Sequence, residues 1–178
     1  MEPKQVADEI LLSATPVMRI TSLSQHQWYR KPTGPRRGPW FSSQYEVVNQ
    51  SLWKKREECI YFVRDEEGEL RYVGISVNRL ADRWRSSPAY DKELNSLGRN
   101  ELFHSQCWPQ ICSNHSFEKP SGYYVSVLHG RNLLSALSEL NHPLACLSKF
   151  TDDPEMAVIA LEVWFVKKFS TQLWNKRK

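Results

Sequence analysis

The chain has 178 residues, of which 40% are hydrophobic and 12% aromatic, and this suits one domain with a packed core rather than two. No apolar run approaches the roughly 18 residues that a membrane span requires, and charges interrupt the N-terminal sequence where a signal peptide would be apolar. Four scattered cysteines are too few for a disulfide scaffold. We therefore expect a cytoplasmic protein with reduced thiols, neither membrane-spanning nor disulfide-rich.

The formal net charge is +4, and the positive charge is concentrated in two segments that lack acidic residues. Residues 10–45 contain no Asp or Glu, and neither do the residues after Glu162. The basic residues of these segments include Arg30, Lys31, Arg36, Arg37, Lys167 and Lys168. Such clustering favours a polyanion partner, because neutralised phosphates release their counterions. The alternative is a solvated surface with a charged tail.

The N-terminal third combines a short helical segment with a long irregular one. Residues 4–13 predict a helix, and Pro16 is expected to end it. Residues 22–43 mix prolines and glycines with aromatic and basic residues, a composition that resists regular structure. We expect a long ordered loop there, forming a basic N-terminal arm.

The middle of the chain predicts a hairpin followed by a helix. Segments 59–63 and 70–76 are rich in β-branched and aromatic residues, and a polar turn separates them. A helix is expected over 78–85, capped by its first residue, with Leu80 and Trp84 facing inward.

Beyond residue 86 the pattern is weaker until the last element. Residues 122–130 predict a third strand and residues 132–140 a short helix. The final helix is the clearest: Asp153 can cap it, Pro154 suits its first turn, and the apolar sequence continues to about Phe169.

Glu162 is unusual within that final helix. Its neighbours one turn away are all apolar, namely Val158, Ile159, Phe165 and Val166. An unpartnered buried carboxylate costs at least several kcal/mol, so the group must be paired with a cation, bound to a metal, or protonated. A functional carboxylate and a structural ion pair with an arginine are equally compatible with this position.

Five short motifs follow one another on these elements. They are CIY at 59–61, YVG at 72–74, the arginine of DRW, the glutamate of ALEVWFVKKF and the asparagine of LWN. In this order they resemble the GIY-YIG nuclease superfamily, over roughly residues 57–86 and 122–178. The resemblance implies an α/β (α+β) fold, with a small three-stranded antiparallel sheet flanked by helices. Residues 1–55 would be an extension, and residues 56–178 a nuclease domain with a helical insertion at about 87–121.

The resemblance also implies roles in single-metal phosphodiester hydrolysis. Tyr61 would help to deprotonate the attacking water, and Tyr72 would lie beside it at the phosphate. Arg83 would stabilise the phosphorane, Glu162 would be the only protein ligand of one Mg²⁺ or Mn²⁺, and Asn175 would brace the site. Mg²⁺ accepts such a site because it keeps waters and binds substrate phosphate. A tyrosine is a poor base unless positive charge lowers its pKa, and the metal and Arg83 would supply that charge.

The chain departs from the family pattern in two places near the arginine. Arg83 follows the second tyrosine one residue later than usual, so Arg79 competes for the functional role. Arg83 is preferred because the next residue is the inward Trp84. Ser87 occupies the place where the family often has a histidine, and three residues could replace it: Tyr90, His104 or His129.

One further pattern, H-x2-C-x4-C-x2-H, is formed by His104, Cys107, Cys112 and His115. These ligand types suit tetrahedral zinc, but the usual zinc modules separate their ligand pairs by about a dozen residues or more. We expect two half-buried thiols and two polar loop histidines, with a structural zinc ion as the less favoured alternative.

Together these features predict a compact endonuclease for double-stranded DNA, of restriction or defence type, whose tyrosines face a phosphate rather than the core. The basic arm, Arg79, Lys167 and Lys168 would hold the DNA. A nuclease toxin or repair nuclease would share this chemistry, and a non-catalytic nucleic-acid-binding module would share only the fold. The sequence leaves the oligomeric state open, a dimer included.

Overall fold

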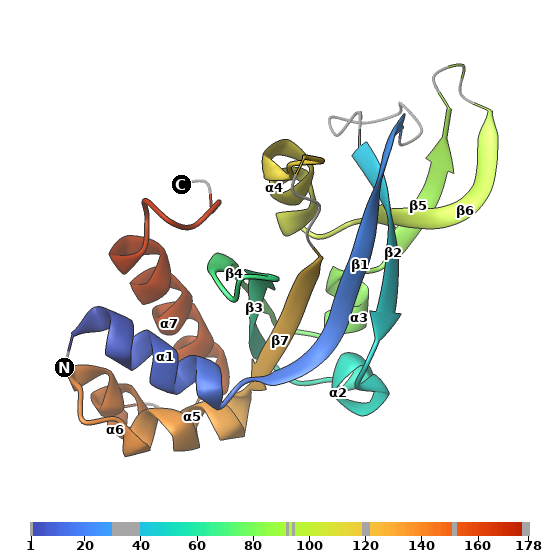
Figure 1. The fold of residues 1–178 in the computed structure, drawn as a ribbon. Helices are drawn as coiled ribbons and strands as arrows, with labels where there is room; N and C mark the ends of the chain where they lie inside the picture. Colours follow the sequence, from blue (N-terminus) through green and yellow to red (C-terminus); the bar gives the residue numbers. More distant parts are fainter. Residues whose placement is uncertain are drawn as a thin grey trace.

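The computed structural model describes residues 2–29, 40–91, 93, 95–118, 122–150 and 153–175. Its largest element is a five-stranded antiparallel sheet with the strand order β2-β1-β7-β3-β4 (Figure 1). The strands are β1 (Thr15–Trp28), β2 (Trp40–Val47), β3 (Cys59–Asp65), β4 (Leu70–Ser76) and β7 (Tyr123–His129). A separate two-stranded sheet consists of β5 (Ser86–Tyr90) and β6 (Ser96–Phe103).

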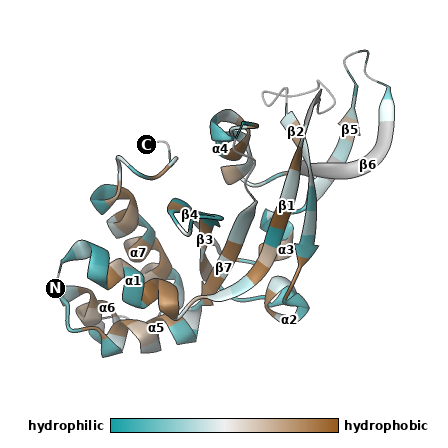
Figure 2. Cartoon of the chain, in the orientation of Figure 1, coloured by the Kyte–Doolittle hydropathy of each residue, from teal (hydrophilic) through white to brown (hydrophobic). Residues whose placement is uncertain are grey.

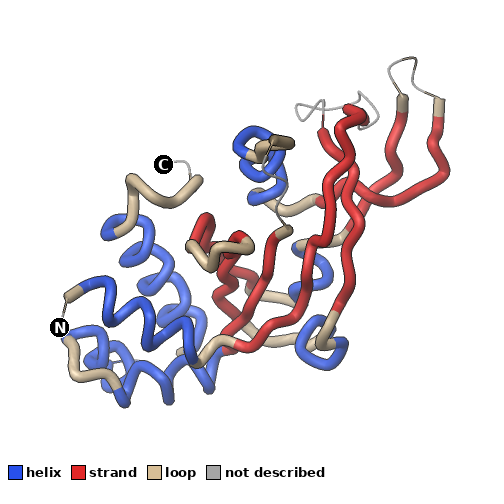
Figure 3. The backbone as a smooth tube through the Cα atoms, viewed as in Figure 1, coloured by secondary structure: helices blue, strands red, loops and turns tan. Residues whose placement is uncertain are grey.

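Helices pack on both faces of the five-stranded sheet. They are α1 (Pro3–Leu12), α2 (Gln50–Lys54), α3 (Leu80–Arg83), α4 (Cys107–Asn114), α5 (Gly130–Glu139), the 3₁₀ helix η1 (Pro143–Cys146), α6 (Leu147–Phe150) and α7 (Pro154–Lys168). Residues of α1, α5 and α7 form the core on one face, and residues of α2, α3, α4 and β6 form it on the other. Figure 3 shows α1, α5, α6 and α7 gathered on one side of the strands. Within the described ranges, no helix is both long and apolar enough to cross a membrane.

Strand β3 is buried on both faces because packed elements cover each face of the sheet. Alternate side chains point to opposite faces. Tyr61 and Val63 therefore belong to one core cluster, and Ile60 and Phe62 to the other. This explains the unbroken apolar run of β3, which Figure 2 shows among the hydrophobic strands at the centre of the molecule.

The expected three-stranded sheet is wrong in its number of strands. The hairpin β3-β4 and the third strand β7 do form an antiparallel unit, in the order β7-β3-β4. Strand β1 pairs with the other edge of β7, and β2 pairs with β1, so the sheet has five strands. The described part of residues 1–55 is thus continuous with the sheet of the expected nuclease domain.

The long loop expected over residues 22–43 is likewise wrong for its described part. Strand β1 continues through Trp28, and β2 begins at Trp40. Pro16 does not end the helix but lies in β1, next to a register irregularity that a strand proline favours. The four basic residues predicted to form the arm, Arg30, Lys31, Arg36 and Arg37, lie outside the described residues.

Most of the other predicted elements are confirmed. The first helix, the hairpin, β7, α5 and α7 lie where the sequence places them. The Asp153 carboxylate caps α7 by accepting a hydrogen bond from Glu155 N at 2.9 Å, and Pro154 occupies the first turn. The helix expected over 78–85 begins later, because Arg79 and not Asn78 precedes α3. Leu80 and Trp84 are buried as predicted.

The insertion at about 87–121 is not purely helical. It contains the β5-β6 hairpin and then α4, and β6 lies beside β2. The rings of Tyr45 on β2 and Phe103 on β6 meet edge to face at 4.8 Å. The insertion therefore packs against the sheet on the face that carries Tyr61.

Candidate active site

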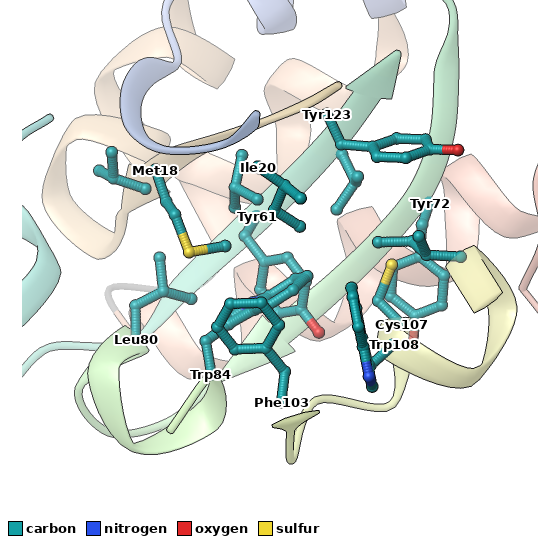
Figure 4. Packing of buried hydrophobic residues seen from close by; sticks show 14 of the residues in the cluster. Met18, Ile20, Tyr61, Tyr72, Leu80, Trp84, Phe103, Cys107, Trp108 and Tyr123 are labelled. Atoms are coloured by element: carbon teal, nitrogen blue, oxygen red, sulfur yellow. The ribbon is translucent and has the colours of Figure 1, made fainter. Parts of the chain in front are cut away.

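The two motif tyrosines lie side by side on adjacent strands. Tyr61 of β3 is opposite Gly74 of β4, and Tyr72 is opposite Val63, so the tyrosines are diagonal neighbours on one face. Their ring centroids are 6.2 Å apart and the rings are 21° from parallel. Figure 4 shows both rings within the buried cluster.

Gly74 makes this arrangement sterically possible. A Cβ atom at Gly74 would lie 2.5 Å from Cζ and Oη of Tyr61 and 2.9 Å from Cε1 of Tyr72. These separations are far below van der Waals contact. The sequence showed Gly74 only as part of a motif, and its role in seating Tyr61 was missed.

Gly74→Ala is expected to destabilise the fold by about 1–3 kcal/mol, because Tyr61 is enclosed and its ring has little room to move. Urea denaturation measures this loss. In a Tyr61→Ala background the nearer of the two rings that the new methyl would strike is gone and Tyr72 has room to move, so the same glycine change should cost less than half as much. Equal costs in the two backgrounds would show that Gly74 is needed for another reason.

Both tyrosines are in the core, contrary to the expectation that they face a phosphate. Tyr61 is 0% exposed and Tyr72 is 7% exposed. The ring of Trp84 meets Tyr61 edge to face at 5.9 Å, and Cys107 lies close enough to influence both tyrosines electrostatically. The hydroxyl of Tyr61 finds no hydrogen-bond partner among the described residues.

Arg83 brings a positive charge to the tyrosines. The short helix α3 buries Leu80, the following Trp84 is also buried, and the half-buried Arg83 side chain is thereby directed towards Tyr61. Its charge interacts with Tyr61, Tyr72 and Glu162. Burial opposes the charged form of the guanidinium, but these neighbours outweigh burial and raise the pKa of Arg83. The guanidinium and the Tyr61 hydroxyl lie within hydrogen-bonding range of each other, and Arg83 Nε itself is buried without a well-aligned acceptor among the described groups.

The tyrosine hydroxyls remain protonated at neutral pH. Burial raises the pKa of Tyr61 well above the usual value, the neighbouring Tyr72 raises it further, and Arg83 lowers it. Burial also raises the pKa of Tyr72, with Cys107 and Glu162 adding to the rise and Arg83 opposing it. In this arrangement desolvation outweighs the charge of Arg83, so Arg83 alone does not lower the pKa of either tyrosine, and the predicted lowering by a metal together with Arg83 stays a prediction.

Glu162 of α7 lies at the boundary between the core and the surface. Of its apolar neighbours, Val158 and Phe165 are buried, but Ile159 is 38% exposed, so Glu162 is half-buried and not enclosed. Its carboxylate interacts electrostatically with Tyr72 and Arg83. The β3-β4 hairpin, the α3 helix that directly follows it and the distant α7 thus contribute to one cluster of Tyr61, Tyr72, Arg83 and Glu162.

Asn175 holds the open edge of β4. Its Oδ1 accepts a hydrogen bond from Val73 N at 3.1 Å, and its Nδ2 donates to Val73 O at 2.7 Å. The preceding Trp174 N donates to Arg71 O at 2.7 Å. The segment around Asn175 therefore continues the hydrogen bonding of the sheet beyond its last strand, directly beside Tyr72.

Asn175→Ala is expected to lower the free energy of unfolding by about 1–3 kcal/mol, because both backbone groups of Val73 lose their partner. Urea denaturation with fluorescence detection measures the change. Gln172→Ala is the matched control: Gln172 Nε2 donates to Glu69 Oε2 at 3.0 Å in an exposed position. Its loss should cost under about 0.5 kcal/mol. A similar cost for the two variants would contradict a specific role of Asn175.

The other predicted nucleic-acid contacts are surface residues. Arg79 donates two hydrogen bonds to Asp82, from Nε at 2.9 Å and Nη2 at 3.0 Å, and half of its side chain is exposed. Lys167 and Lys168 are exposed in the last turn of α7, where positive charge suits the helix dipole. Of the two arginines considered for the functional role, only Arg83 interacts with both tyrosines.

The residues of the H-x2-C-x4-C-x2-H pattern are spread over α4 and its ends. Cys107 is fully buried, Cys112 and His104 are half-buried, and the half-buried His115 shares a hydrogen bond between Nδ1 and Tyr123 Oη at 3.0 Å. Within the part of the chain that the structure describes, no three His, Cys, Asp or Glu side chains are grouped so as to hold a metal ion.

The three proposed histidine replacements lie on different parts of the chain, and His104 N donates to Arg85 O at 2.9 Å. Tyr90 pairs its backbone N and O with Tyr29 at 2.9 Å each. His129 ends β7, where burial and the charge of Lys55 lower its pKa. The residues that do enclose the tyrosines, Phe103, Cys107 and Trp108, were missed, although the apolar positions 107, 108 and 111 have helical spacing.

No protein-family model, curated protein or solved structure matches the chain.

Proposed function

We propose that this protein is a divalent-metal-dependent endonuclease that hydrolyses phosphodiester bonds in DNA, of restriction or defence type. One observation carries the proposal: Tyr61, Tyr72, Arg83 and Glu162, chosen from sequence motifs as much as a hundred residues apart, form one electrostatically connected cluster. Asn175, the fifth motif residue, is hydrogen-bonded to the backbone next to Tyr72. Motifs that resembled the GIY-YIG nucleases by chance would not be expected to converge in this way.

The donor set fits a hard divalent cation. Glu162 offers a partly exposed carboxylate, and Mg²⁺ or Mn²⁺ is satisfied by one or two carboxylates together with waters and substrate phosphate. Glu162 would hold the ion, which when bound would polarise the phosphate and lower the pKa of a coordinated water. The fit depends on the partial exposure of Glu162, because a fully buried carboxylate could not share an ion with a substrate.

The protein's own groups would then act on the phosphate by charge and hydrogen bonding. Arg83 would neutralise non-bridging oxygens as negative charge develops on them. The raised pKa of Tyr61 and Tyr72 makes both hydroxyls hydrogen-bond donors at neutral pH. They would orient the water or a phosphate oxygen, and the proton released by the attacking water would pass to bulk solvent on the partly exposed Glu162 side of the site.

A second function has one observation in its favour. Tyr61 is 0% exposed, so a substrate cannot reach its hydroxyl in this conformation. If the conformation is permanent, the protein would be a non-catalytic nucleic-acid-binding module. Nuclease toxins and repair nucleases share the chemistry of the main proposal and differ from it in substrate and partners.

The test is incubation of the purified protein with supercoiled plasmid in Mg²⁺, in Mn²⁺ and in EDTA. Discrete fragments that require the metal support a sequence-specific endonuclease, and a smear supports a toxin-like enzyme. Retarded but intact plasmid supports the binding module. The Glu162→Gln variant, purified in parallel, should not cleave the plasmid. A contaminating nuclease would be present in both preparations and would cleave in both.

A further inference from the structure

Helix α4 lies over the tyrosines and closes them off from solvent. Its buried residues Cys107, Trp108 and Ile111 share one helical face and belong to the same cluster as Tyr61 and Tyr72. Cys107 is close enough to both tyrosines to influence them electrostatically. Figure 4 shows Cys107 and Trp108 beside the tyrosine rings.

The aromatic residues around α4 complete the enclosure. Trp108 meets Phe103 at 5.1 Å, Phe103 meets Trp84 at 5.3 Å, and Trp84 meets Tyr61 at 5.9 Å, all edge to face. With α4 in this position Tyr61 is 0% exposed, and a phosphate or an attacking water cannot reach its hydroxyl.

The enclosed polar atoms are poorly satisfied. Four of them find no hydrogen-bond partner in the described part of the chain: Tyr61 Oη, Arg83 Nε, Trp84 Nε1 and Trp108 Nε1. All four can donate, and buried donors without acceptors are rare in folded proteins. The closed arrangement therefore leaves donors without a well-aligned acceptor, Trp84 Nε1 and Trp108 Nε1 above all, that an oxygen-rich ligand could satisfy.

Helix α4 is held by the burial of Cys107, Trp108 and Ile111 and by a few further contacts, all of them outside the ladders of the sheet. Phe41 N donates to the Cys112 sulfur, a weak acceptor, at 3.4 Å. The Phe41 and Phe117 rings meet at 4.8 Å, and His115 shares its hydrogen bond with Tyr123. Moving α4 would break these contacts but no strand pairing of the five-stranded sheet.

We propose that α4, residues 107–114, is a displaceable cover over the Tyr61–Tyr72–Arg83 cluster, and that DNA binding displaces it. The second half of this proposal rests on the proposed function, because it requires a nucleic-acid ligand. The first half does not, since local opening of the cover in the free protein is a property of the fold alone.

Native-state thiol labelling tests the cover, because the chain carries its own controls. Cys107 on the inner face of the cover and Cys59 within β3 are both 0% exposed, whereas Cys146 is exposed. Wild-type protein is treated with a thiol reagent, and the labelling of each cysteine is followed by peptide mass spectrometry. Cys59 reports opening of the sheet, and Cys146 reports the reagent's intrinsic rate.

In the free protein we expect Cys107 to react at least about tenfold faster than Cys59, because a local opening costs less than disruption of the sheet. Equal protection of the two thiols, each released only by global unfolding, would overturn the cover. Adding a short DNA duplex in EDTA should raise the rate at Cys107 further and leave Cys59 unchanged.

The labelling experiment with added DNA distinguishes displacement of α4 from the proposed nuclease function. If fluorescence anisotropy shows that the duplex binds while Cys107 labelling stays constant or falls, displacement by DNA is overturned and the nuclease proposal is untouched. If the duplex does not bind at all, the proposed function fails together with displacement, and the free-protein comparison still decides whether α4 opens.

Phe117→Ala supplies an independent check, since it removes the ring contacts with Phe41 and His115. It should raise the Cys107 rate relative to Cys59 by about tenfold, as expected when a locally opening unit is weakened. Phe169→Ala is the control, because Phe169 contacts Trp164 and Phe165 on the opposite face of the sheet. An unchanged rate ratio in Phe117→Ala would overturn the role of these contacts in holding the cover.

Discussion

Glu162→Gln is expected to lower plasmid cleavage by about a thousandfold or more, the largest loss that we expect from any single substitution in this chain. The carboxamide keeps the size of the side chain but cannot hold Mg²⁺ as a carboxylate does. Binding of duplex DNA should be unchanged or tighter, because one negative charge near the phosphate is lost. Initial cleavage rates and fluorescence anisotropy separate the two effects.

Glu155→Gln is the matched control for this change. Glu155 lies in the first turn of the same helix and is exposed, away from the tyrosine cluster. Its substitution should leave cleavage within about twofold of wild type, as for an ordinary surface position. If Glu162→Gln retained about a tenth of the wild-type rate or more, Glu162 could not be the metal ligand.

Arg83→Ala is expected to reduce the cleavage rate at saturating DNA by about 100- to 1000-fold, because the charge that stabilises the transition state is removed. Arg83→Lys should restore little of the rate, since an ammonium group does not reproduce the planar guanidinium. Single-turnover kinetics measure the chemical step, and a urea titration shows whether each variant is folded.

Arg79→Ala is the control for Arg83→Ala. Arg79 is four residues earlier and is held by Asp82 at the surface. Arg79→Ala should therefore change the rate at saturating DNA by less than about threefold, although it can weaken binding at high salt. Equal losses in the two variants, or a greater loss in Arg79→Ala, would transfer the functional role to Arg79.

The parts of the fold that the sequence predicted correctly are those specified by neighbouring residues. The hairpin follows from two β-branched and aromatic segments around a polar turn, and α7 follows from Asp153 and Pro154 at its start. Arg83 could be distinguished from Arg79 because Trp84 marks the buried side of α3. In each case the signal lies within one or two turns of the residue concerned.

The parts that were missed depend on distant partners. Strand β1 pairs with β7, about a hundred residues later, and nothing local to residues 15–28 specifies that partner. The prolines and glycines between the first two strands are typical of irregular structure and mask the strand pattern on either side. The burial of Tyr61 is likewise decided by Phe103, Cys107 and Trp108, which come from the insertion. A residue's own sequence context cannot show which later segment will cover it.

The hydrogen bonds of Trp174 and Asn175 have a consequence for association between copies of the protein. Strand β4 ends the sheet, and an uncovered outer strand offers its backbone groups as a template for strands of other molecules. Arg71 O and both backbone groups of Val73 are occupied by this segment, and at the opposite end β2 lies beside β6. Cleavage of the chain before residue 173 would strip this protection from β4 and favour edge-to-edge aggregation.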